Sequence, residues 1–434
     1  IKILLGDAVQ RGELTMDQRN KQLAAMTDEV ERLVLADNYR QNQAISLMER
    51  MSVQRLGSKL HFVRTLESQG LLDRAIEYLP TDAEFAERKA RGIGLTRPEL
   101  SVLLSYSKIV LFQQLLDSDV PEDPYLSKEL RRYFPVPLQE KYAAHMERHR
   151  LKREIIATAV TNSMVNRMGA TFVLRMGEDT GKTPAQVARA FNIAREVFDA
   201  RDMWAQIEAL DGKVNGNAQI DALLVIWQCL RGTTRWLLNH ADEGLDIAAA
   251  VAKYHKGMQE LRKQLYDVVT PSERAIFESE QRRWKEAGFP DALGSELAGL
   301  RTPGSGLDII HVASDHKLRI GEAAEVYFGL GESLNLNWLM QKIEALPVES
   351  QWHAQARGGL RDELYAQHRA LTAQVLEGGK GKGNDLVATW LNRDDPSLKF
   401  TLAMFADMRS QVVTDYPIVS VAVRRLANLV QQRA

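Results

Sequence analysis

Apolar residues recur along most of this chain three or four positions apart, which is the spacing of one buried helical stripe. Between residues 27 and 47, for example, Val30, Leu33, Val34 and Ile45 stand in this pattern among charged neighbours. The alternation of apolar and polar residues that marks a half-buried strand is almost absent. The pattern therefore predicts an all-α protein, an irregular array of roughly fifteen to twenty helices with little or no sheet.

Recurrent start and stop residues mark the helix boundaries. Thr96, followed three residues later by Glu99, has the sequence of a capping box. Thr183, Thr270 and Thr302 each precede a proline suited to the first helical turn. We expect helices to stop near the residues that punctuate the periodic stretches, which are Gly70, Pro80, Gly92, Gly177, Gly212, Gly288, Gly358 and Gly359.

Proline- and glycine-rich stretches indicate where the array divides. Residues 119–124 and 133–137 hold four of the 13 prolines, and residues 288–306 are rich in glycine, proline and serine. We therefore expect a first, a central and a C-terminal helical part. The predicted bounds are residues 1–118, 119–290 and 291–434.

Composition and charge narrow the classes of partner. The 434 residues are 45% hydrophobic and 26% charged, and 56 basic residues balance 57 acidic ones to a formal net charge of −1. This balance gives no electrostatic reason to expect nucleic acid or an anionic membrane as a partner. Neither a secretory signal nor an apolar run near the roughly 18 residues of a membrane span is present. The single cysteine, Cys229, cannot form an intramolecular disulfide, so we expect a cytoplasmic protein.

Several blocks of residues follow one another in an order that one protein family shares. They read DNYRQ at 37–41, LTRPELSVLLSYSK at 95–108, RYFP at 132–135, HRLKREIIAT at 149–158, NSMVNRMGATF at 162–172, ARAF at 188–191 and VYFGLG at 326–331. Together they resemble the C-terminal helical region of the large NAD-specific glutamate dehydrogenases of bacteria. The resemblance extends over essentially the whole chain.

The resemblance implies a very long parent with regulatory N-terminal domains, a central catalytic region and this helical tail. The full-length parent would oxidatively deaminate L-glutamate to 2-oxoglutarate and ammonia, with NAD bound in the catalytic region. Residues 1–5 (IKILL) resemble the stretch that follows that region, and the chain has no initiator methionine. We therefore expect a fragment whose first part continues from the missing catalytic domain as a helical linker.

The resemblance assigns this fragment a structural, assembly or regulatory role and no activity of its own. Its expected partners are its own catalytic domain and neighbouring subunits of a homo-oligomer. Two alternatives stay open. One is a free-standing helical scaffold or protein-interaction domain without catalytic activity, and the other is a metal enzyme that uses His145 with His149, or the residues around His311.

No catalytic, cofactor-binding or metal-binding residue is predicted in the fragment. A dinucleotide fingerprint needs a strand, a Gly-x-Gly-x-x-Gly turn and a helix that meets the pyrophosphate. Residues 92–94 (GIG) have Arg97 where the third glycine belongs, and residues 329–331 (GLG) have Leu334 there. Both glycine pairs therefore favour a structural reading.

Residues 177–183 (GEDTGKT) imitate a phosphate-binding loop, but the first glycine stands one residue too close to the Gly-Lys-Thr. Glu178 and Asp179 would also repel a phosphate. We interpret Gly177 as the end of one helix and Thr183 as the cap of the next.

The remaining polar candidates have plain structural readings. His145 and His149 are four residues apart on a predicted helix, a spacing that can chelate zinc, but a solvated basic face is favoured. Asp308, His311, Asp315 and His316 are interpreted as surface pairs one helical turn apart.

Buried positions follow from the apolar stripes. Cys229 is expected to be a buried small hydrophobe rather than a nucleophile. The tryptophans at helical spacings are expected in the core. The other residues predicted to be largely buried are Tyr106, Phe112, Ile155, Val165, Phe172 and Trp227.

Overall fold

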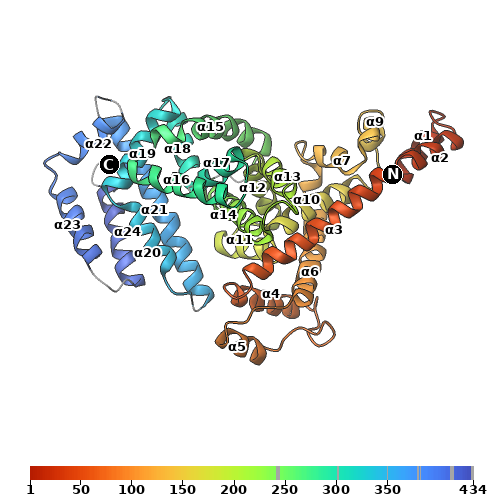
Figure 1. Cartoon of the computed structure of the whole chain (residues 1–434), viewed down its shortest axis with the longest axis horizontal. Helices are drawn as coiled ribbons and strands as arrows, with labels where there is room; N and C mark the ends of the chain where they lie inside the picture. The colour runs from red at the N-terminus through yellow and green to blue at the C-terminus, as the bar shows by residue number, and fades with distance from the viewer. Residues whose placement is uncertain are drawn as a thin grey trace. The chain divides into compact units, whose positions relative to one another are not determined.

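The computed structural model (Figure 1) describes residues 1–240, 245–300, 303–348, 350–378, 381, 383–410 and 415–431. These residues form 24 α-helices and one short 3-10 helix, and none of them lies in a strand. The all-α prediction is therefore confirmed for the part of the chain described. The expected number of helices was too low, because many of the helices span fewer than three turns and give a weak periodic pattern. The shortest are α8 (Val136–Gln139) and α9 (Ala143–Glu147).

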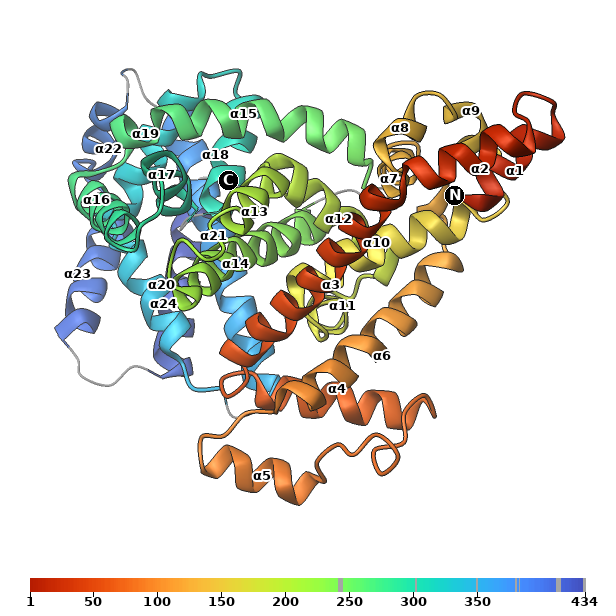
Figure 2. The same ribbon diagram turned by 45° about the vertical axis from the view of Figure 1, so that its right-hand side comes forward.

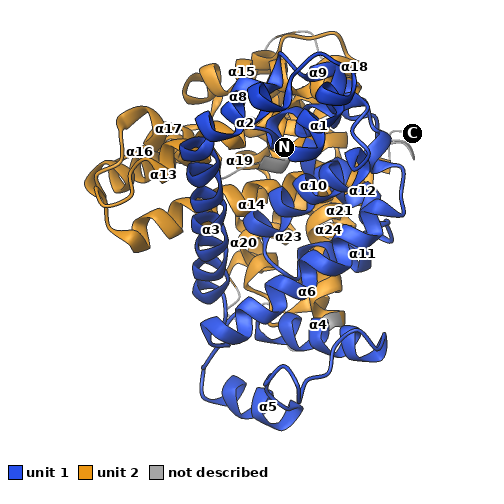
Figure 3. Ribbon diagram, turned by 90° about the vertical axis from the view of Figure 1, so that its right-hand side faces the viewer, with its two compact units in different colours: residues 1–192, 241–248 blue, residues 193–240, 249–434 orange. Residues whose placement is uncertain are grey.

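The chain folds into two compact units, which Figure 3 draws in different colours. Unit 1 comprises Ile1–Asn192 and Ala241–Ala248, and unit 2 comprises Ile193–His240 and Ala249–Ala434. Each is described below by itself. The three-part division expected from composition stays a prediction.

Unit 1 is built around three long helices, α3, α6 and α10, which Figure 2 shows as neighbouring ribbons. Helix α10 packs against α3, α6 and α7, and its buried face includes Ile156, Val160 and Met164. The helices of this unit are α1 (Lys2–Gln10), α2 (Met16–Ala25), α3 (Thr27–Arg50), α4 (Leu56–Ser68), α5 (Asp82–Ala90), α6 (Arg97–Leu116), η1 (Val120–Glu122), α7 (Ser127–Tyr133), α8, α9, α10 (Lys152–Met168), α11 (Phe172–Thr180) and the start of α12 (Pro184–Val197).

Unit 2 is centred on α18, α19 and α21, which pack against one another. Helices α14 and α24 cover α18 and α21 respectively, and α22 packs on α19. The helices of this unit are α13 (Ala200–Glu208), α14 (Gly216–His240), α15 (Ile247–Val268), α16 (Pro271–Glu286), α17 (Asp291–Gly299), α18 (Pro303–Asp315), α19 (Ile320–Ser333), α20 (Leu336–Ala345), α21 (Gln351–Gly378), α22 (Asn384–Leu391), α23 (Pro396–Ser410) and α24 (Tyr416–Gln431).

Three of the predicted helix caps are confirmed. The backbone N–H of Thr96 donates to the Glu99 carboxylate at 2.7 Å, which is the return half of a capping box. The hydroxyls of Thr183 and Thr270 accept from backbone N–H groups in the first turns of α12 and α16. Thr302 lies outside the described residues.

Two predicted helix ends are wrong. Helix α11 continues through Gly177 to Thr180 and stops at Gly181, whose φ of 69° is the left-handed conformation that glycine adopts freely. Gly358 and Gly359 lie inside α21. A Cβ on Gly358 would lie 2.8 Å from the Arg235 guanidinium, so this glycine makes room for an arginine instead of ending the helix.

Burial follows the predicted stripes only in part. Val165, Phe172 and Trp227 are buried as expected. The remaining three positions are half-buried, and they are Tyr106, Phe112 and Ile155. Across the helices that the structure describes, none combines the length and the hydropathy needed to cross a membrane.

Candidate functional site

The interpretation of His145 and His149 as a solvated pair on one helix face is wrong. Both side chains are buried, with 5% and 8% of their surface exposed. Helix α9 ends at Glu147, so the two histidines do not share a helix. The ring of His149 packs on Phe134 at a centroid distance of 5.7 Å. Both rings therefore lie in the interior of unit 1.

His145 joins two carboxylates from the beginning of the chain. Its Nδ1 lies 2.6 Å from Asp7 Oδ2, and its Nε2 lies 2.8 Å from Glu13 Oε2. Asp7 is on α1, and Glu13 is in the turn that follows it. The hydrogen bond with His145 holds the pKa of Asp7 below its usual value. A buried ring therefore connects α9 to α1 and to the turn after it through contacts on both nitrogens.

Further polar contacts connect the first 50 residues to residues 97–167, and we call the set, with His145, the junction. Each contact joins one residue of α1, α2 or α3 to a residue far along the chain. The pairs are Gln22 Oε1 with Tyr142 OH at 2.8 Å, Glu29 Oε1 with the Val136 N–H at 2.9 Å, Gln43 Oε1 with Arg167 Nη1 at 2.7 Å, and Glu49 Oε2 with Arg97 Nη1 at 2.8 Å.

Apolar packing accompanies these polar contacts. Leu4 and Leu5 on α1 are 1% and 0% exposed, and Ala44, Leu47 and Met48 line the buried face of α3. Helix α1 packs against α2 and α9, and α3 packs against α6 and α10. Helix α1 and the C-terminal end of α3 therefore contribute to the core of unit 1, whereas α2 has no buried side chain.

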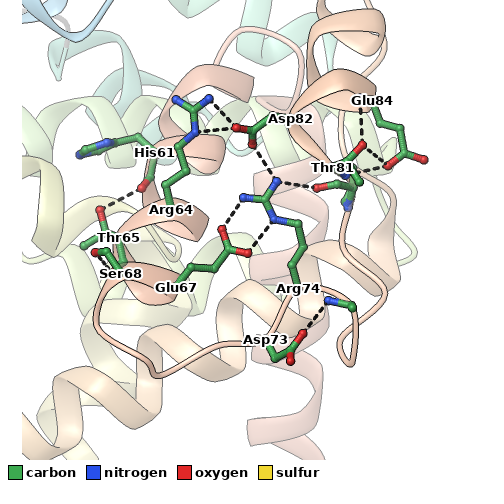
Figure 4. Close-up of polar contacts among 12 residues, drawn as sticks. His61, Arg64, Thr65, Glu67, Ser68, Asp73, Arg74, Thr81, Asp82 and Glu84 are labelled. Carbon is green, nitrogen blue, oxygen red and sulfur yellow. Dashed lines mark hydrogen bonds and ion pairs between the residues drawn. The ribbon is translucent and has the colours of Figure 1, made fainter.

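An ion-pair network organises α4, α5 and the segment between them (Figure 4). Arg74 lies at its centre and donates to Glu67 Oε1 at 3.0 Å, to Asp82 Oδ1 at 2.7 Å and to the Pro80 carbonyl at 3.1 Å. Arg64 Nη2 donates to the other oxygen of Asp82 at 2.7 Å. The two arginines lower the pKa of Asp82 to about 2.

The segment of α4 and α5 is also tied to the start of α6. Arg88 donates to both carboxylate oxygens of Glu99, at 2.7 and 2.8 Å. The Leu95 N–H donates to the hydroxyl of Ser52 at 2.7 Å. Lys59 is buried beside this contact and donates to the Ser52 carbonyl at 3.3 Å. Burial lowers the pKa of Lys59 to about 7, which no pattern in the sequence indicated.

The surface interpretation of Asp308 in unit 2 is also wrong. Asp308 is completely buried, and it accepts from Trp236 Nε1 and from Arg369 Nη1, each at 2.9 Å. Burial raises its pKa to about 6. The predicted pair of His311 and Asp315 is confirmed one turn along α18 at 3.3 Å, whereas His316 lies 3.6 Å from Glu377 Oε1.

Cys229 is a buried thiol, as predicted, with 1% of its surface exposed. Burial raises its pKa to about 12. Among the residues that the structure describes, no three His, Cys, Asp or Glu side chains are grouped so as to hold a metal ion.

The glycine pairs that imitate nucleotide motifs have packing roles. Gly92 has a φ of 65° and follows the end of α5, while a Cβ on Gly94 would lie 2.4 Å from the Ser52 side chain. In α19, a Cβ on Gly329 would lie 2.7 Å from Asn384 Oδ1, and one on Gly331 would lie 3.2 Å from His368. Gly94, Gly329 and Gly331 therefore permit close approach between segments, while Gly92 permits the left-handed turn after α5.

Comparison with known families gives the two sides of the junction different descriptions. The family described as "Glutamate dehydrogenase, C-terminal" matches residues 92–428. The chain belongs to this family. A second description, "Bacterial NAD-glutamate dehydrogenase, catalytic domain", matches residues 1–48. The sequence resemblance had put the end of the catalytic region before Ile1, whereas this description extends over α1, α2 and most of α3.

Curated relatives of this glutamate dehydrogenase C-terminal domain extend well beyond it. It is 41% identical over 433 residues to the NAD-specific glutamate dehydrogenase of Pseudomonas aeruginosa, covering 99% of this chain and 27% of the relative. It is 38% identical over 436 residues to the NAD-specific glutamate dehydrogenase of Halomonas elongata, covering 100% of this chain and 27% of the relative. It is 29% identical over 432 residues to that of Mycobacterium tuberculosis, covering 99% of this chain and 26% of the relative. The chain spans about a quarter of the length of these relatives, and the family predicted from the sequence blocks is confirmed.

Proposed function

We propose that this chain is the helical domain that supports and assembles an NAD-specific glutamate dehydrogenase. In its full-length form, that enzyme oxidatively deaminates L-glutamate to 2-oxoglutarate and ammonia in the cytoplasm. NAD and the reacting groups belong to parts of the enzyme outside this chain. We expect the chain alone to have no activity and to act on its own catalytic domain and on neighbouring subunits.

The observation that carries this proposal is the junction. Residues matched by the catalytic-domain description are packed into the same compact unit as residues matched by the C-terminal family. A free-standing scaffold would have no need for a segment of a catalytic domain in its core. Support for subunit contacts comes from α3, where Val34 and Leu35 leave 56% and 59% of their surface exposed. The apolar stripe had predicted that Val34 is buried.

The junction gives a physical route from this domain to turnover. Closure of a catalytic cleft depends on hinge segments held by packing on both sides, and altered packing changes turnover without touching the chemistry. Helices α1 to α3 are held on one side by His145, Arg97 and Arg167. We therefore propose that unit 1 fixes the position of the last part of the catalytic domain.

The test is made in the full-length enzyme that contains this chain. Leu5→Ala removes a completely buried side chain from α1, and Lys2→Ala is the matched exposed control on the same helix. Loss of a buried leucine side chain costs about 2–5 kcal/mol of packing, so we expect kcat or the oligomer mass to fall in Leu5→Ala alone. Kinetics and mass that stay unchanged in both variants would contradict the proposal.

A further inference from the structure

Unit 2 contains a cavity of about 380 Å³, within the size range of small-molecule sites. It is lined by residues from the end of α15 and from α16 to α21, all of which belong to unit 2. Much of its wall is apolar, with the rings of Phe277 and Phe328 and the side chains of Leu265, Met340 and Leu364. Such a wall accommodates an apolar body of a few carbon atoms or one ring.

One carboxylate in the wall is incompletely satisfied. Glu273 lies in the first turn of α16, and its Oε1 accepts from Asn337 Nδ2 at 3.0 Å. Its Oε2 is shielded from solvent and has no hydrogen-bond partner among the described residues. Burial raises the pKa of Glu273, and nearby Glu332 adds to the rise. A buried carboxylate oxygen without a partner is costly, and a donor from a ligand would relieve that cost.

The second glutamate of the cavity, Glu344, has a cationic partner. Glu344 is paired with Arg361, whose Nη1 lies 2.9 Å from Glu344 Oε1. The described lining residues include no lysine and no arginine. The charge that remains unbalanced at this wall is therefore negative and is located at Glu273.

Aromatic rings also contribute to the lining of the cavity. Tyr327, Tyr365 and His368 line the cavity, and the rings of Tyr327 and His368 stack at a centroid distance of 3.6 Å. The electron-rich faces of tyrosine and phenylalanine attract cations, and their flat surfaces pack against apolar groups. The negative charge and the apolar, aromatic wall thus both suit a molecule that carries a cation on an apolar body.

We propose that this cavity is a binding site for a small organic ammonium compound, with its amine on Glu273 and its apolar body against Phe277 and Phe328. A carboxylate ligand of the same shape would meet Glu273 without a compensating cation. A neutral alcohol would supply a hydrogen bond but would leave the charge unbalanced. The proposal concerns unit 2 alone and does not depend on the role proposed for the junction.

Three probes that differ only in the head group test it on the 434-residue chain, namely phenethylamine, 2-phenylethanol and phenylacetate. Calorimetric titration should show phenethylamine binding at least tenfold more tightly than the other two, because hydrogen bonds to charged groups are the stronger ones. Glu273→Gln keeps the shape and removes the charge, so it should lower that affinity at least tenfold. The matched control is Glu286→Gln, an exposed glutamate on the same helix.

A second variant separates loss of charge from loss of the cavity. Ala298→Leu places a larger side chain in the wall and should weaken all three probes together. Absence of binding by every probe at about 10 mM would show a cavity that holds only water, and it would overturn the proposal. Equal binding of the three probes, or phenethylamine binding unchanged in Glu273→Gln, would overturn it as well.

Discussion

Acidification should destabilise unit 2 through one buried histidine, His368 on α21. The ring is 8% exposed, and Nε2 donates to the Tyr327 carbonyl at 2.8 Å. Burial lowers its pKa from 6.5 to about 4, and the bond to Tyr327 only partly opposes this. Between those two values the unfolded chain binds a proton that the folded unit does not. The free energy of unfolding therefore falls as the pH falls through this window.

The magnitude follows from the two pKa values. The whole gap is worth about 3 kcal/mol, because each tenfold change in proton affinity is worth about 1.4 kcal/mol. Between pH 7 and pH 5, His368 should contribute a loss of about 2 kcal/mol. Asp308 acts in the opposite direction, since its pKa is raised to about 6 and acidification stabilises the folded state by about 1 kcal/mol over the same interval. In wild type, the contribution of Asp308 would therefore mask much of the pH dependence that His368 causes.

Comparison with a variant isolates the contribution of His368 to the pH dependence. His368→Gln keeps a donor for the Tyr327 carbonyl but cannot take up the proton, so its stability should fall by about 2 kcal/mol less than that of wild type between pH 7 and pH 5. Urea unfolding followed by tryptophan fluorescence is the assay, because all seven tryptophans lie in unit 2. The half-buried His316 supplies the control, His316→Gln. The same pH dependence in wild type and His368→Gln would refute the reasoning.

Three further predictions concern single side chains. Lys59→Met should raise the free energy of unfolding at pH 7 by about 3 kcal/mol, because burying the charged ammonium group costs free energy. This gain should shrink towards pH 10, where the lysine is neutral in the folded chain, and urea unfolding without any gain at pH 7 would contradict the prediction. Gly94→Ala should cost about 1–3 kcal/mol through overlap with Ser52, while Gly57→Ala, which meets nothing within 4 Å, should cost nothing; equal thermal stability of the two variants would argue against the overlap. Cys229 should react with a thiol reagent at least a hundredfold more slowly in the native chain than in urea, and similar rates would show that its burial is transient.

The helical part of this fold is predictable because its signals are local. Apolar stripes and threonine caps depend on residues within one or two turns, and the capping box at Thr96 needs only Glu99. The stop assigned to Gly358 is wrong for the opposite reason. The absence of a side chain at Gly358 leaves room for the guanidinium of Arg235, which is more than a hundred residues away in the sequence. A glycine that makes room and a glycine that ends a helix look alike in one sequence.

The candidate sites were largely unpredictable for the same physical reason. His145 is defined by Asp7 and Glu13, which are 138 and 132 residues earlier in the chain. Asp308 has a local partner pattern on α18 that predicts the surface, but its actual partners include Trp236 and Arg369. Periodicity indicates which face of a helix is buried and carries no information about which distant polar groups meet there.

The most direct test of the central claim, that residues 1–48 fold as one unit with the first part of the C-terminal family region, is hydrogen exchange of the 434-residue chain in two histidine variants. His145→Ala removes the bridge to Asp7 and Glu13, whereas His149→Ala empties an equally buried site that forms no hydrogen bond with α1. We predict that the amides of α1 and of the turn after it exchange at least tenfold faster in His145→Ala than in wild type. In His149→Ala the same amides should exchange as in wild type, and the amides of α21 in unit 2 should be unaffected in both variants. Unchanged exchange of α1 in His145→Ala, or the same acceleration in both variants, would contradict the claim.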